Sequence, residues 1–492
     1  MEYLVIGGYL FFLTFILLYS IHQLYLVSAY LKAKNPMHRT PIQPTIWPKV
    51  TIQLPLYNER YVANRLINCI CQFDYDKTLL QIQVLDDSTD DTSEILAIEI
   101  EKFKSQGFNI EHIRRTNRVD FKAGALKHGL EKATGEFVAI FDADFLPEPD
   151  YLRKTVPYFQ DENVGVVQVR WGHLNEKYSA LTQIQAYALN AHFSIEQKGR
   201  NSKNHFINFN GTAGIWRREA IENAGNWQGD TLTEDLDLSY RAQLNNWKFV
   251  YLEDEIAPAE LPTTMNGIKS QQYRWAKGAA ECAGKNLSKV LRDKNVKFST
   301  KYAAAFHLLN SFVWVCVFLS GMLLLPFLKI IGSDFLDRNL LGFIGIYHFS
   351  FFALLIFYVI ANWQFGIKST KDFFKILLLY PLFLALSMGL SLYISSGVIK
   401  GYLGIKTAFV RTPKFNISSS LDQFKGKQYT QWKMNWFVLA EILCLGYFAF
   451  SSYYAYQNQY WISLPFLAMQ CLGFGMVLFY AYRHAQLANK KG

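Results

Sequence analysis

Long apolar stretches divide this 492-residue chain into parts of very different composition. Residues 3–30 and most of 302–482 are strongly apolar, whereas residues 45–300 have the mixed composition of a water-soluble domain. A stretch of about 20 apolar residues is long enough to cross a bilayer as a helix. The chain is therefore predicted to be a multi-pass membrane protein with a soluble domain inserted between its membrane segments.

This division predicts an order of segments along the chain. We expect a transmembrane helix first, then an extended linker that contains four prolines, then the soluble domain and a second membrane region. The stretch before that second region has apolar residues at helical spacing with basic residues between them, which is typical of a helix in the membrane interface. The predicted segments are 1–32, 33–48, 49–278, 279–301 for the interfacial helix, and 302–492.

The net charge of +10 lies partly beside the apolar stretches. Lys32, Lys34 and Arg39 follow the first stretch, and six basic residues from Lys285 to Lys301 precede the second. Basic residues next to membrane spans mark their cytoplasmic side, so we expect a plasma- or inner-membrane protein with a cytosolic soluble domain. The same distribution argues against a nucleic-acid partner, because the positive residues do not gather on the soluble domain.

One apolar stretch of the second region is less clearly a span than the others. Residues 373–398 contain Pro381 and several serines and glycines, and the segment 400–434 that follows is basic. A full span would place that basic segment outside, so the charge rule favours an interfacial or re-entrant position. The predicted apolar stretches of this region are 302–328, 340–362, 373–398, 435–456 and 461–482.

The soluble domain alternates short apolar runs with helix-length stretches, which predicts an α/β fold with a mostly parallel sheet covered on both faces. The expected helices lie at 61–72, 92–106 and 121–133. The expected strands are Val50–Leu54, Ile82–Leu85, Ile110–Ile113, Phe137–Phe141 and Val164–Val169.

Two carboxylates follow the most apolar of these strands. Asp142 and Asp144 come directly after Phe137–Phe141, and ligands of α/β sheets bind just beyond the carboxyl ends of strands. Two carboxylates together with phosphate oxygens suit Mg²⁺ or Mn²⁺. The alternative is a polar turn without a ligand, since aspartate is common in turns.

Acidic side chains also follow the first two predicted strands. Glu59 ends the run Pro-Leu-Tyr-Asn-Glu, and Asp86 and Asp87 open a run of seven polar residues. Helix capping explains part of that second run but does not require its first two aspartates. A carboxylate at a strand end accepts hydrogen bonds from a nucleobase or ribose.

A further acidic pair is predicted to lie in the first turn of a helix. Leu236, Tyr240 and Leu244 form one helical face, which places Glu234 and Asp235 at the N-terminus. The helix dipole alone favours acidic residues there, and it would equally keep Asp235 ionised as a base for a sugar hydroxyl. The two interpretations are evenly matched on this pattern.

The run Gln271-Gln-Tyr-Arg-Trp275 precedes the predicted interfacial helix. Arg274 could pair with a diphosphate, and Trp275 offers a flat face to a sugar ring. The same residues could instead anchor the domain at the membrane surface.

Eight sequence words in order resemble the membrane-bound family 2 glycosyltransferases. They are most similar to the cellulose-synthase-like A and C proteins, which make β-mannan and β-glucan backbones, and more distantly to bacterial cellulose synthase. Each word alone is weak, but together they cover the soluble domain. The words are QLPLYNER (53–60), LDDSTD (85–90), FKAGAL (121–126), FDADF (141–145), VQVRWGHLN (167–175), FNGTAGIWR (209–217), TEDLDLSYRAQLNNW (233–247) and QQYRWAKG (271–278).

The resemblance implies a GT-A fold and an inverting, metal-dependent transfer from a nucleotide sugar, UDP-glucose or GDP-mannose. By this resemblance the catalytic group is Asp235 as general base with Glu234 and Asp144, and Mg²⁺ or Mn²⁺ is held by Asp142 and Asp144. The remaining implied roles are nucleotide-sugar binding by Glu59, Asp86, Asp87, Lys122 and Asp142, and binding of the diphosphate and the acceptor sugar by Gln271, Arg274 and Trp275.

A later segment is similar to the gating loop of cellulose synthase. Phe409, Thr412 and Lys414 match its F-x-x-T-x-K pattern within residues 405–420. That loop lies on the cytoplasmic side, so the match also favours the non-spanning position of 373–398.

The expected function is transfer of a hexose to a growing β-linked polysaccharide with export across the membrane. The alternative is a non-processive transfer of one sugar to a membrane lipid. A third class is a transporter whose soluble domain only binds a nucleotide sugar, which would leave Asp235 and Trp275 without a role.

Overall fold

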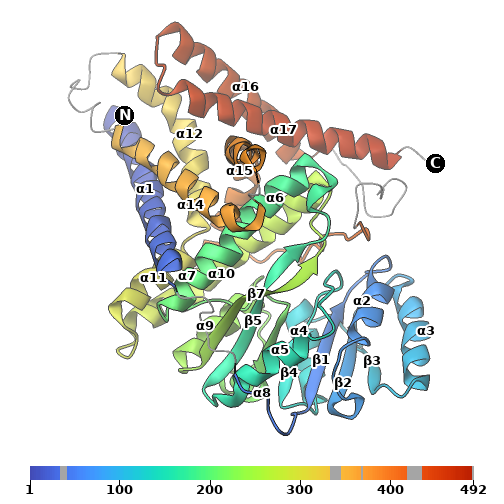
Figure 1. Ribbon diagram of the computed structural model, residues 1–492. Helices are drawn as coiled ribbons and strands as arrows, with labels where there is room; N and C mark the ends of the chain where they lie inside the picture. The colour runs from blue at the N-terminus through green and yellow to red at the C-terminus, as the bar shows by residue number, and fades with distance from the viewer. Residues whose placement is uncertain (34–40, 333–344, 367–368, 418–434, 490–492) are drawn as a thin grey trace.

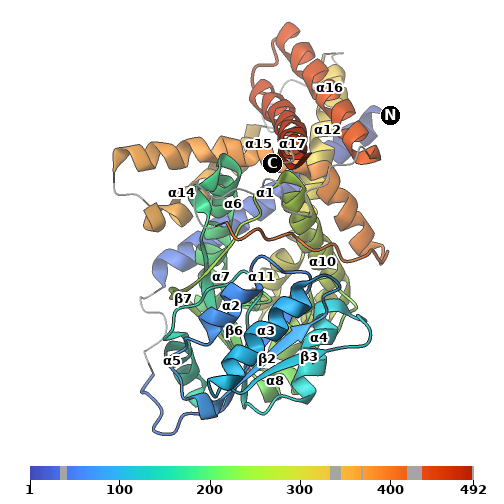
Figure 2. The ribbon, with the colours of Figure 1, turned by 90° about the vertical axis from the view of Figure 1, so that its right-hand side faces the viewer.

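The computed structural model describes residues 1–33, 41–332, 345–366, 369–417 and 435–489. Long apolar helices gather at one end of the molecule and a β-sheet domain lies at the other, as Figures 1 and 2 show. The predicted linker 33–48, the apolar stretch 340–362 and the gating loop 405–420 each lie partly outside the described residues.

The soluble domain is built on a seven-stranded sheet with the order β3-β2-β1-β4-β6-β5-β7. The five predicted strands are confirmed, and β1 runs parallel to both β2 and β4. The short strand β6 runs antiparallel to β4 and β5, so the sheet is mixed and not simply parallel. The strands are β1 (Val50–Leu56), β2 (Leu80–Asp86), β3 (Ile110–Arg114), β4 (Phe137–Ile140), β5 (Val164–His173), β6 (Gly214–Arg217) and β7 (Lys248–Ala259).

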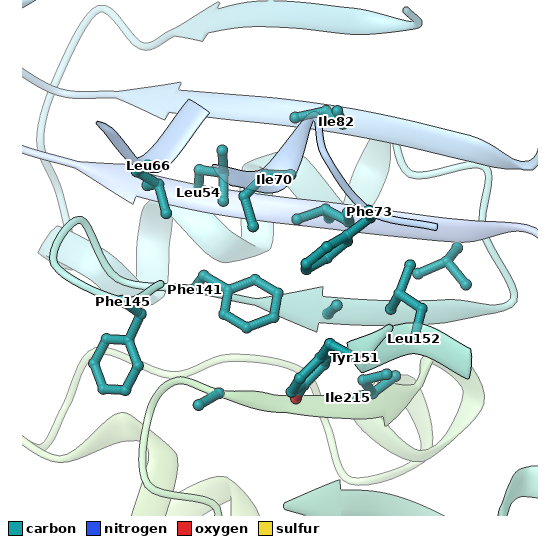
Figure 3. Close-up of a cluster of buried hydrophobic side chains, with 14 of the residues drawn as sticks. Leu54, Leu66, Ile70, Phe73, Ile82, Phe141, Phe145, Tyr151, Leu152 and Ile215 are labelled. Atoms are coloured by element: carbon teal, nitrogen blue, oxygen red, sulfur yellow. The ribbon is translucent and has the colours of Figure 1, made fainter. Parts of the chain in front are cut away.

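Helices cover both faces of this sheet, and each face has its own apolar core. On one face, Phe73, Phe141 and Tyr151 contact one another with ring centroids 5.1–6.0 Å apart (Figure 3). On the other face, Leu126 and Leu238 pack with Trp216 of β6. The covering helices are α2 (Ala63–Ile70), α3 (Thr92–Ser105), α4 (Phe121–Glu131), α5 (Tyr151–Thr155), α8 (Arg218–Asn223) and α9 (Glu234–Leu244).

A long helix joins the soluble domain to the membrane region. Helix α10 (Met265–Arg292) begins at Thr264, whose hydroxyl accepts a hydrogen bond from the amide of Gly267. It continues without a break through the predicted boundary at residue 278, because no proline interrupts it. The predicted interfacial helix 279–301 is thus the second half of α10 followed by α11 (Phe298–Leu308), and the run from Gln271 to Trp275 lies within α10.

Among the described residues, six helices are long and apolar enough to cross a membrane. Each overlaps a predicted apolar stretch, although the stretch 302–328 is divided between α11 and α12. Helix α15 also meets these criteria, so the interfacial position predicted for 373–398 stays a prediction. The six helices are α1 (Glu2–Lys32), α12 (Phe312–Ile331), α14 (Phe349–Gly366), α15 (Thr370–Tyr402), α16 (Trp436–Gln457) and α17 (Leu464–Asn489).

Helices α15 and α17 cross at two glycines that leave no room for a side chain. A Cβ atom at Gly473 would lie 1.9 Å from the carbonyl oxygen of Ala385, and one at Gly389 would lie 2.2 Å from the carbonyl oxygen of Gly473. Such close backbone approach is how small residues allow membrane helices to pack. The crossing therefore depends on the absence of side chains at these two positions.

We expect Gly473→Ala to lower the free energy of unfolding by roughly 1–3 kcal/mol, because the added methyl group forces two backbones apart. Gly475 is the matched control, since a Cβ atom there would meet nothing within 4 Å. The melting temperatures of both purified variants in detergent test this expectation. Equal melting temperatures would contradict the close crossing.

Candidate active site

The predicted site residues, with the exception of Asp86, meet in one cavity of about 210 Å³ at the carboxyl ends of the central strands. They come from parts of the chain up to 355 positions apart, between Glu59 and Lys414. Predicted residues that line the cavity are Glu59, Asp87, Lys122, Asp142, Asp144, Glu234, Asp235, Gln271, Arg274, Trp275, Phe409, Thr412 and Lys414.

The two carboxylates after β4 are each paired with an ammonium group. Lys122 donates to Asp142, and the Lys414 ammonium lies 2.7 Å from the Asp144 carboxylate. Both carboxylates line the cavity, and a divalent metal ion held by them would take the place of these ammonium groups. No group of three or more His, Cys, Asp or Glu that could hold a metal occurs among the described residues, so further ligands would have to come from the substrate or water.

Of the two predicted aspartates at the end of β2, Asp87 lines the cavity, whereas Asp86 is buried beside it and accepts hydrogen bonds from neighbouring residues. Asp87 lines the cavity and is held by the guanidinium of Arg115. Asp86 is only 1% exposed and accepts hydrogen bonds from Ser93, from His112 and from the amide of Ser88. Burial opposes ionisation of Asp86, but these hydrogen bonds outweigh it and lower its pKa to about 2. Its predicted contact with the nucleoside stays a prediction, because its carboxylate already supports the loop.

The acidic pair of α9 lies where the sequence predicts it, in the first turn of the helix. One carboxylate oxygen of Asp235 accepts a hydrogen bond from the amide of Leu236. Burial, followed by the neighbouring Glu234, raises the pKa of Asp235 to about 7 in spite of the helix N-terminus. Burial also raises the pKa of Glu234. The cavity therefore holds a carboxyl group that titrates near neutral pH.

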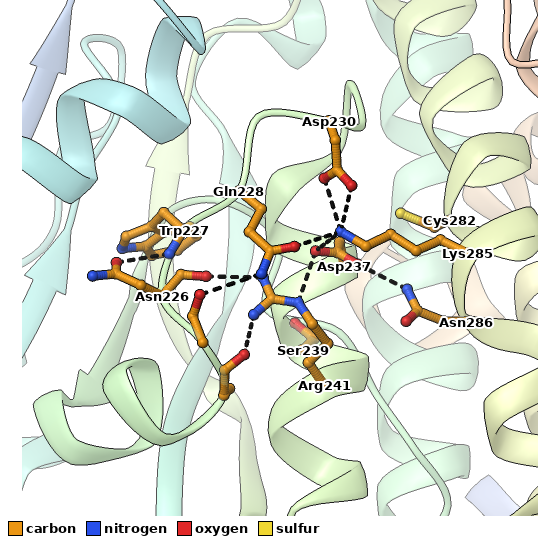
Figure 4. Close-up of polar contacts among 12 residues, drawn as sticks. Asn226, Trp227, Gln228, Asp230, Asp237, Ser239, Arg241, Cys282, Lys285 and Asn286 are labelled. Atoms are coloured by element: carbon orange, nitrogen blue, oxygen red, sulfur yellow. Dashed lines mark hydrogen bonds and ion pairs between the residues drawn. The ribbon is translucent and has the colours of Figure 1, made fainter.

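A network of ion pairs fixes α9 against α10 (Figure 4). Asp237, two positions after Asp235, is fully buried and accepts hydrogen bonds from Arg241, Lys285 and Asn286 at 2.9–3.0 Å. Lys285 and Asn286 belong to α10, so the network joins the two helices. A buried carboxylate is costly without hydrogen-bond partners, and the partners of Asp237 set the position of the acidic pair relative to α10.

The described part of the predicted gating-loop segment, 405–417, runs between the apolar helices and the sheet domain (Figure 2), and four of its residues line the cavity. Arg411 lies 3.0 Å from the carboxylate of Glu59, in addition to the contact of Lys414 with Asp144. Burial raises the pKa of Glu59 to about 8, and Arg411 opposes this shift. The ring of Phe409 stacks on Phe121. The segment thus closes the cavity through charged and aromatic contacts.

A second cavity of about 420 Å³ continues from the first toward the apolar helices. Trp171, Asn210, Asp235, Gln271 and Trp275 line both cavities and so mark their junction. Further lining comes from α6 (Ala180–Ala191) and from α12, α14 and α15, and most of it is apolar. Asp235 therefore faces the soluble domain on one side and the membrane region on the other.

Residues 48–278 match the family model described as "Glycosyltransferase like family 2". This region is a family 2 glycosyltransferase domain. A mannosyltransferase from Pyrobaculum calidifontis, PcManGT, was solved in complex with GDP-Man and Mn²⁺. It is 19% identical to the chain, with a TM-score of 0.51 over 78% of this chain and 98% of its own. This likeness confirms the predicted GT-A fold of the glycosyltransferase domain.

Curated relatives at higher identity are plant enzymes. Glucomannan 4-beta-mannosyltransferase 2 of Arabidopsis thaliana is 40% identical over 58% of this chain and 56% of its own length. Glucomannan 4-beta-mannosyltransferase 1 of Oryza sativa subsp. japonica is 38% identical over 58% of this chain and 57% of its own. The matches span a little over half the length of these two relatives, and they confirm the predicted resemblance to β-mannan synthase-like proteins.

Several lining residues of the glycosyltransferase domain were not among the predicted site residues. Arg118 lies with its guanidinium 3.2 Å from the ring centre of Tyr57, and Glu260 accepts a hydrogen bond from the amide of Phe415 at 2.8 Å. Trp171 and Asn210 lie within the words VQVRWGHLN and FNGTAGIWR, which had no assigned role. The matching words could therefore have indicated Trp171 and Asn210 as site residues. Nothing in the sequence indicates that Glu260 contacts the distant gating-loop segment.

We expect Gly211→Ala to lower sugar transfer at least 10-fold, because a Cβ atom there would lie 2.9 Å from the Asp235 carboxylate at a φ of +78°. Gly107 is a matched control, since its φ is +82° but its Cβ would meet nothing within 4 Å. Transfer rates and melting temperatures of both alanine variants test this. If the two variants lost activity equally, backbone strain alone would be the cause and the crowding of Asp235 would be refuted.

Proposed function

We propose that this chain transfers mannose from GDP-mannose to the end of a growing β-linked glycan. The observation that carries the proposal is the position of Asp235, a carboxyl group of pKa about 7 at the junction of a polar cavity and a membrane-region cavity. The names of the plant relatives and of the archaeal structure favour mannose over glucose. UDP-glucose remains the second donor to be compared.

In this proposal the acceptor hydroxyl enters from the second cavity and the donor lies in the first. Asp235 accepts the hydroxyl proton while the oxygen attacks the anomeric carbon of the donor sugar. The bond from that carbon to the diphosphate breaks, and the nucleoside diphosphate leaves with the bonding electrons. A single displacement inverts the anomeric centre, so an α-linked donor gives a β-linked product.

Asp142 and Asp144 are the residues that fit a divalent metal, Mg²⁺ or Mn²⁺. When bound, such an ion supplies charge neutralisation for the departing diphosphate. Lys122 and Arg274 line the same cavity and add positive charge there. Lys414 reaches the site from the gating-loop segment, so closure of that segment would bring one more cation to the diphosphate.

The second cavity supports a processive reaction with export. Its shared wall with the donor cavity means that a product sugar can move from Asp235 toward the membrane helices without leaving the protein. Its largely apolar lining equally suits the chain of a membrane lipid, and this favours transfer of one sugar to a lipid as the second candidate function. The product distinguishes the two.

The test is incorporation of radiolabelled GDP-mannose and UDP-glucose, in separate reactions, by purified protein in membranes with Mg²⁺ or Mn²⁺. The product is sized and digested with β-mannanase and β-glucanase. A long product that is made from GDP-mannose and cut by β-mannanase is expected. A single-sugar product that extracts into organic solvent would contradict the polymer and favour the lipid acceptor.

We expect Asp235→Asn to lower the transfer rate by about 10²–10⁴-fold, because the amide cannot accept the hydroxyl proton. Asp230→Asn is the control, since Asp230 is half exposed and pairs with Lys285. Transfer of labelled mannose by both variants is the measurement. Normal transfer by Asp235→Asn would refute the role of Asp235 as general base. Absence of transfer by the wild type would instead favour a protein that only binds or transports the nucleotide sugar.

The raised pKa of Asp235 predicts a specific pH dependence. The base works only when deprotonated, so kcat/KM should be high above pH 7 and fall as the pH drops through about 7. A pH profile of kcat/KM for the acceptor at saturating donor tests this, with protein stability measured in parallel. A profile that stays flat down to pH 5 would contradict the buried position of this carboxyl group.

A further inference from the structure

Some buried polar atoms at the junction of the two cavities have no hydrogen-bond partner in the structure. Three of them are Nε1 of Trp171, Nε2 of His173 and Nδ2 of Asn210. Trp171 and Asn210 line both cavities, and His173 lines the donor cavity. A buried donor without a partner is costly, so such atoms in a cavity wall point to a ligand that supplies acceptors.

We propose that Trp171, His173 and Asn210 form a site that recognises the hydroxyl groups of the sugar at the acceptor end. The proposal rests on the proposed sugar transfer and extends it by naming the side chains that select the acceptor. None of these three residues belongs to the predicted catalytic, nucleotide or metal-binding set.

Strand β5 places two of the three residues side by side. Trp171 and His173 are two positions apart on β5, so their side chains leave the same face of the strand. Between them, a Cβ atom at Gly172 would lie 2.7 Å from Ile256 of β7, so a side chain on the opposite face would crowd that residue. Burial lowers the pKa of His173 to about 4, so its ring is neutral at neutral pH. A neutral imidazole can either donate to or accept from a hydroxyl group.

Aromatic neighbours hold the Trp171 ring in place. Its centroid lies 5.1 Å from that of Phe145 and 4.9 Å from that of Phe193. Trp275 also lines the junction, and its ring is tilted against that of Trp171 with the centroids 6.4 Å apart. The two indoles offer apolar surface to a sugar ring, and Nε1 of Trp171 adds a donor of fixed direction.

A chain of polar contacts fixes the orientation of Asn210. Its Oδ1 accepts a hydrogen bond from Asn208 at 2.9 Å and lies 3.0 Å from Nε2 of His192. The other ring nitrogen of His192 lies 2.8 Å from Glu196, which also accepts from Gln23 of α1. With Oδ1 held in this way, the amide nitrogen Nδ2 is left as the donor for a ligand.

The segment that carries this chain is itself unusual. Residues His192–Glu196 form a π-helical turn between α6 and α7 (Gln197–Ser202). Such turns occur often at functional sites. This turn places His192 against Asn210 and Glu196 against Gln23 of α1. The amide group of Asn210 is therefore held through His192 and Glu196 by a contact that reaches the first membrane helix.

Fixed donors of this kind discriminate between sugar epimers. Mannose and glucose differ only in the direction of the hydroxyl at C2, and a hydroxyl that points away from its partner leaves a buried donor unpaired. The site is therefore expected to select between manno- and gluco-configured acceptor ends. Trp171 and Asn210 line the acceptor cavity as well, whereas His173 lines the donor cavity, so substitutions of the first two residues are the ones expected to change acceptor binding.

The test measures the acceptor KM and the donor KM of the wild type, Trp171→Phe and Asn210→Ala as full-length membrane proteins. Each protein is measured with a manno-oligosaccharide and with a cello-oligosaccharide as the acceptor. Each substitution removes one neutral hydrogen bond to the acceptor, and Asn210→Ala also removes the contacts of Oδ1 with Asn208 and His192. We expect the acceptor KM to rise about 3–10-fold while the donor KM stays constant. The preference between the two acceptors should shrink by a similar factor. Trp216→Phe is the matched control, because Nε1 of Trp216 is also buried and unpaired but lies in the apolar core of the sheet.

An unchanged acceptor KM in active Trp171→Phe and Asn210→Ala variants would overturn this inference and leave the proposed function standing. A rise of the donor KM alone would overturn it as well. Absence of transfer by the wild type with either donor would refute the proposed function itself. If Trp171→Phe fails to fold, as its melting temperature would show, Asn210→Ala decides the outcome.

Discussion

The structure depends on one helix that belongs to both halves of the molecule. Helix α10 carries Gln271, Arg274 and Trp275 into the active-site cavity and packs along α15 of the apolar helices. The buried ion pair between Lys269 of α10 and Glu441 of α16 adds a charged contact at the same interface. Buried charges in such a position are costly to separate, so the catalytic helix and the membrane region are held in one arrangement.

This arrangement explains why one acidic pair can serve two cavities. The network around Asp237 ties α9 to α10, so Asp235 keeps its position when α10 is held by the membrane helices. In the proposed reaction the acceptor hydroxyl lies beside Asp235 and attacks the anomeric carbon from the side opposite the departing diphosphate, and the position of Asp235 at the junction of the two cavities is compatible with this. The described residues of the gating-loop segment line the first cavity, where Arg411 and Lys414 meet Glu59 and Asp144.

The sequence predicted the fold where the pattern is local. Apolar runs such as Phe137–Phe141 identify buried strands. Because ligands bind at the carboxyl ends of such strands, the carboxylates that follow them were predicted as site residues. Strands β6 and β7 were not predicted, because the four residues of β6 carry no period and β7 contains charged residues and a proline. The predicted boundary at 278 is the end of the region that matches the family model, and it lies within the continuous helix α10. The contacts of Glu260 and Arg411 with distant segments, and the raised pKa of Asp235, arise from tertiary packing that no local pattern encodes.

The central claim is that sugar transfer at Asp235 feeds directly into the cavity of the membrane region. The most direct measurement uses sealed proteoliposomes supplied with labelled GDP-mannose from outside, so that only outward-facing catalytic domains react. The account predicts a labelled polymer that resists external β-mannanase until detergent opens the vesicles. A polymer fully digested before detergent is added would contradict a continuous path from the active site through the membrane region.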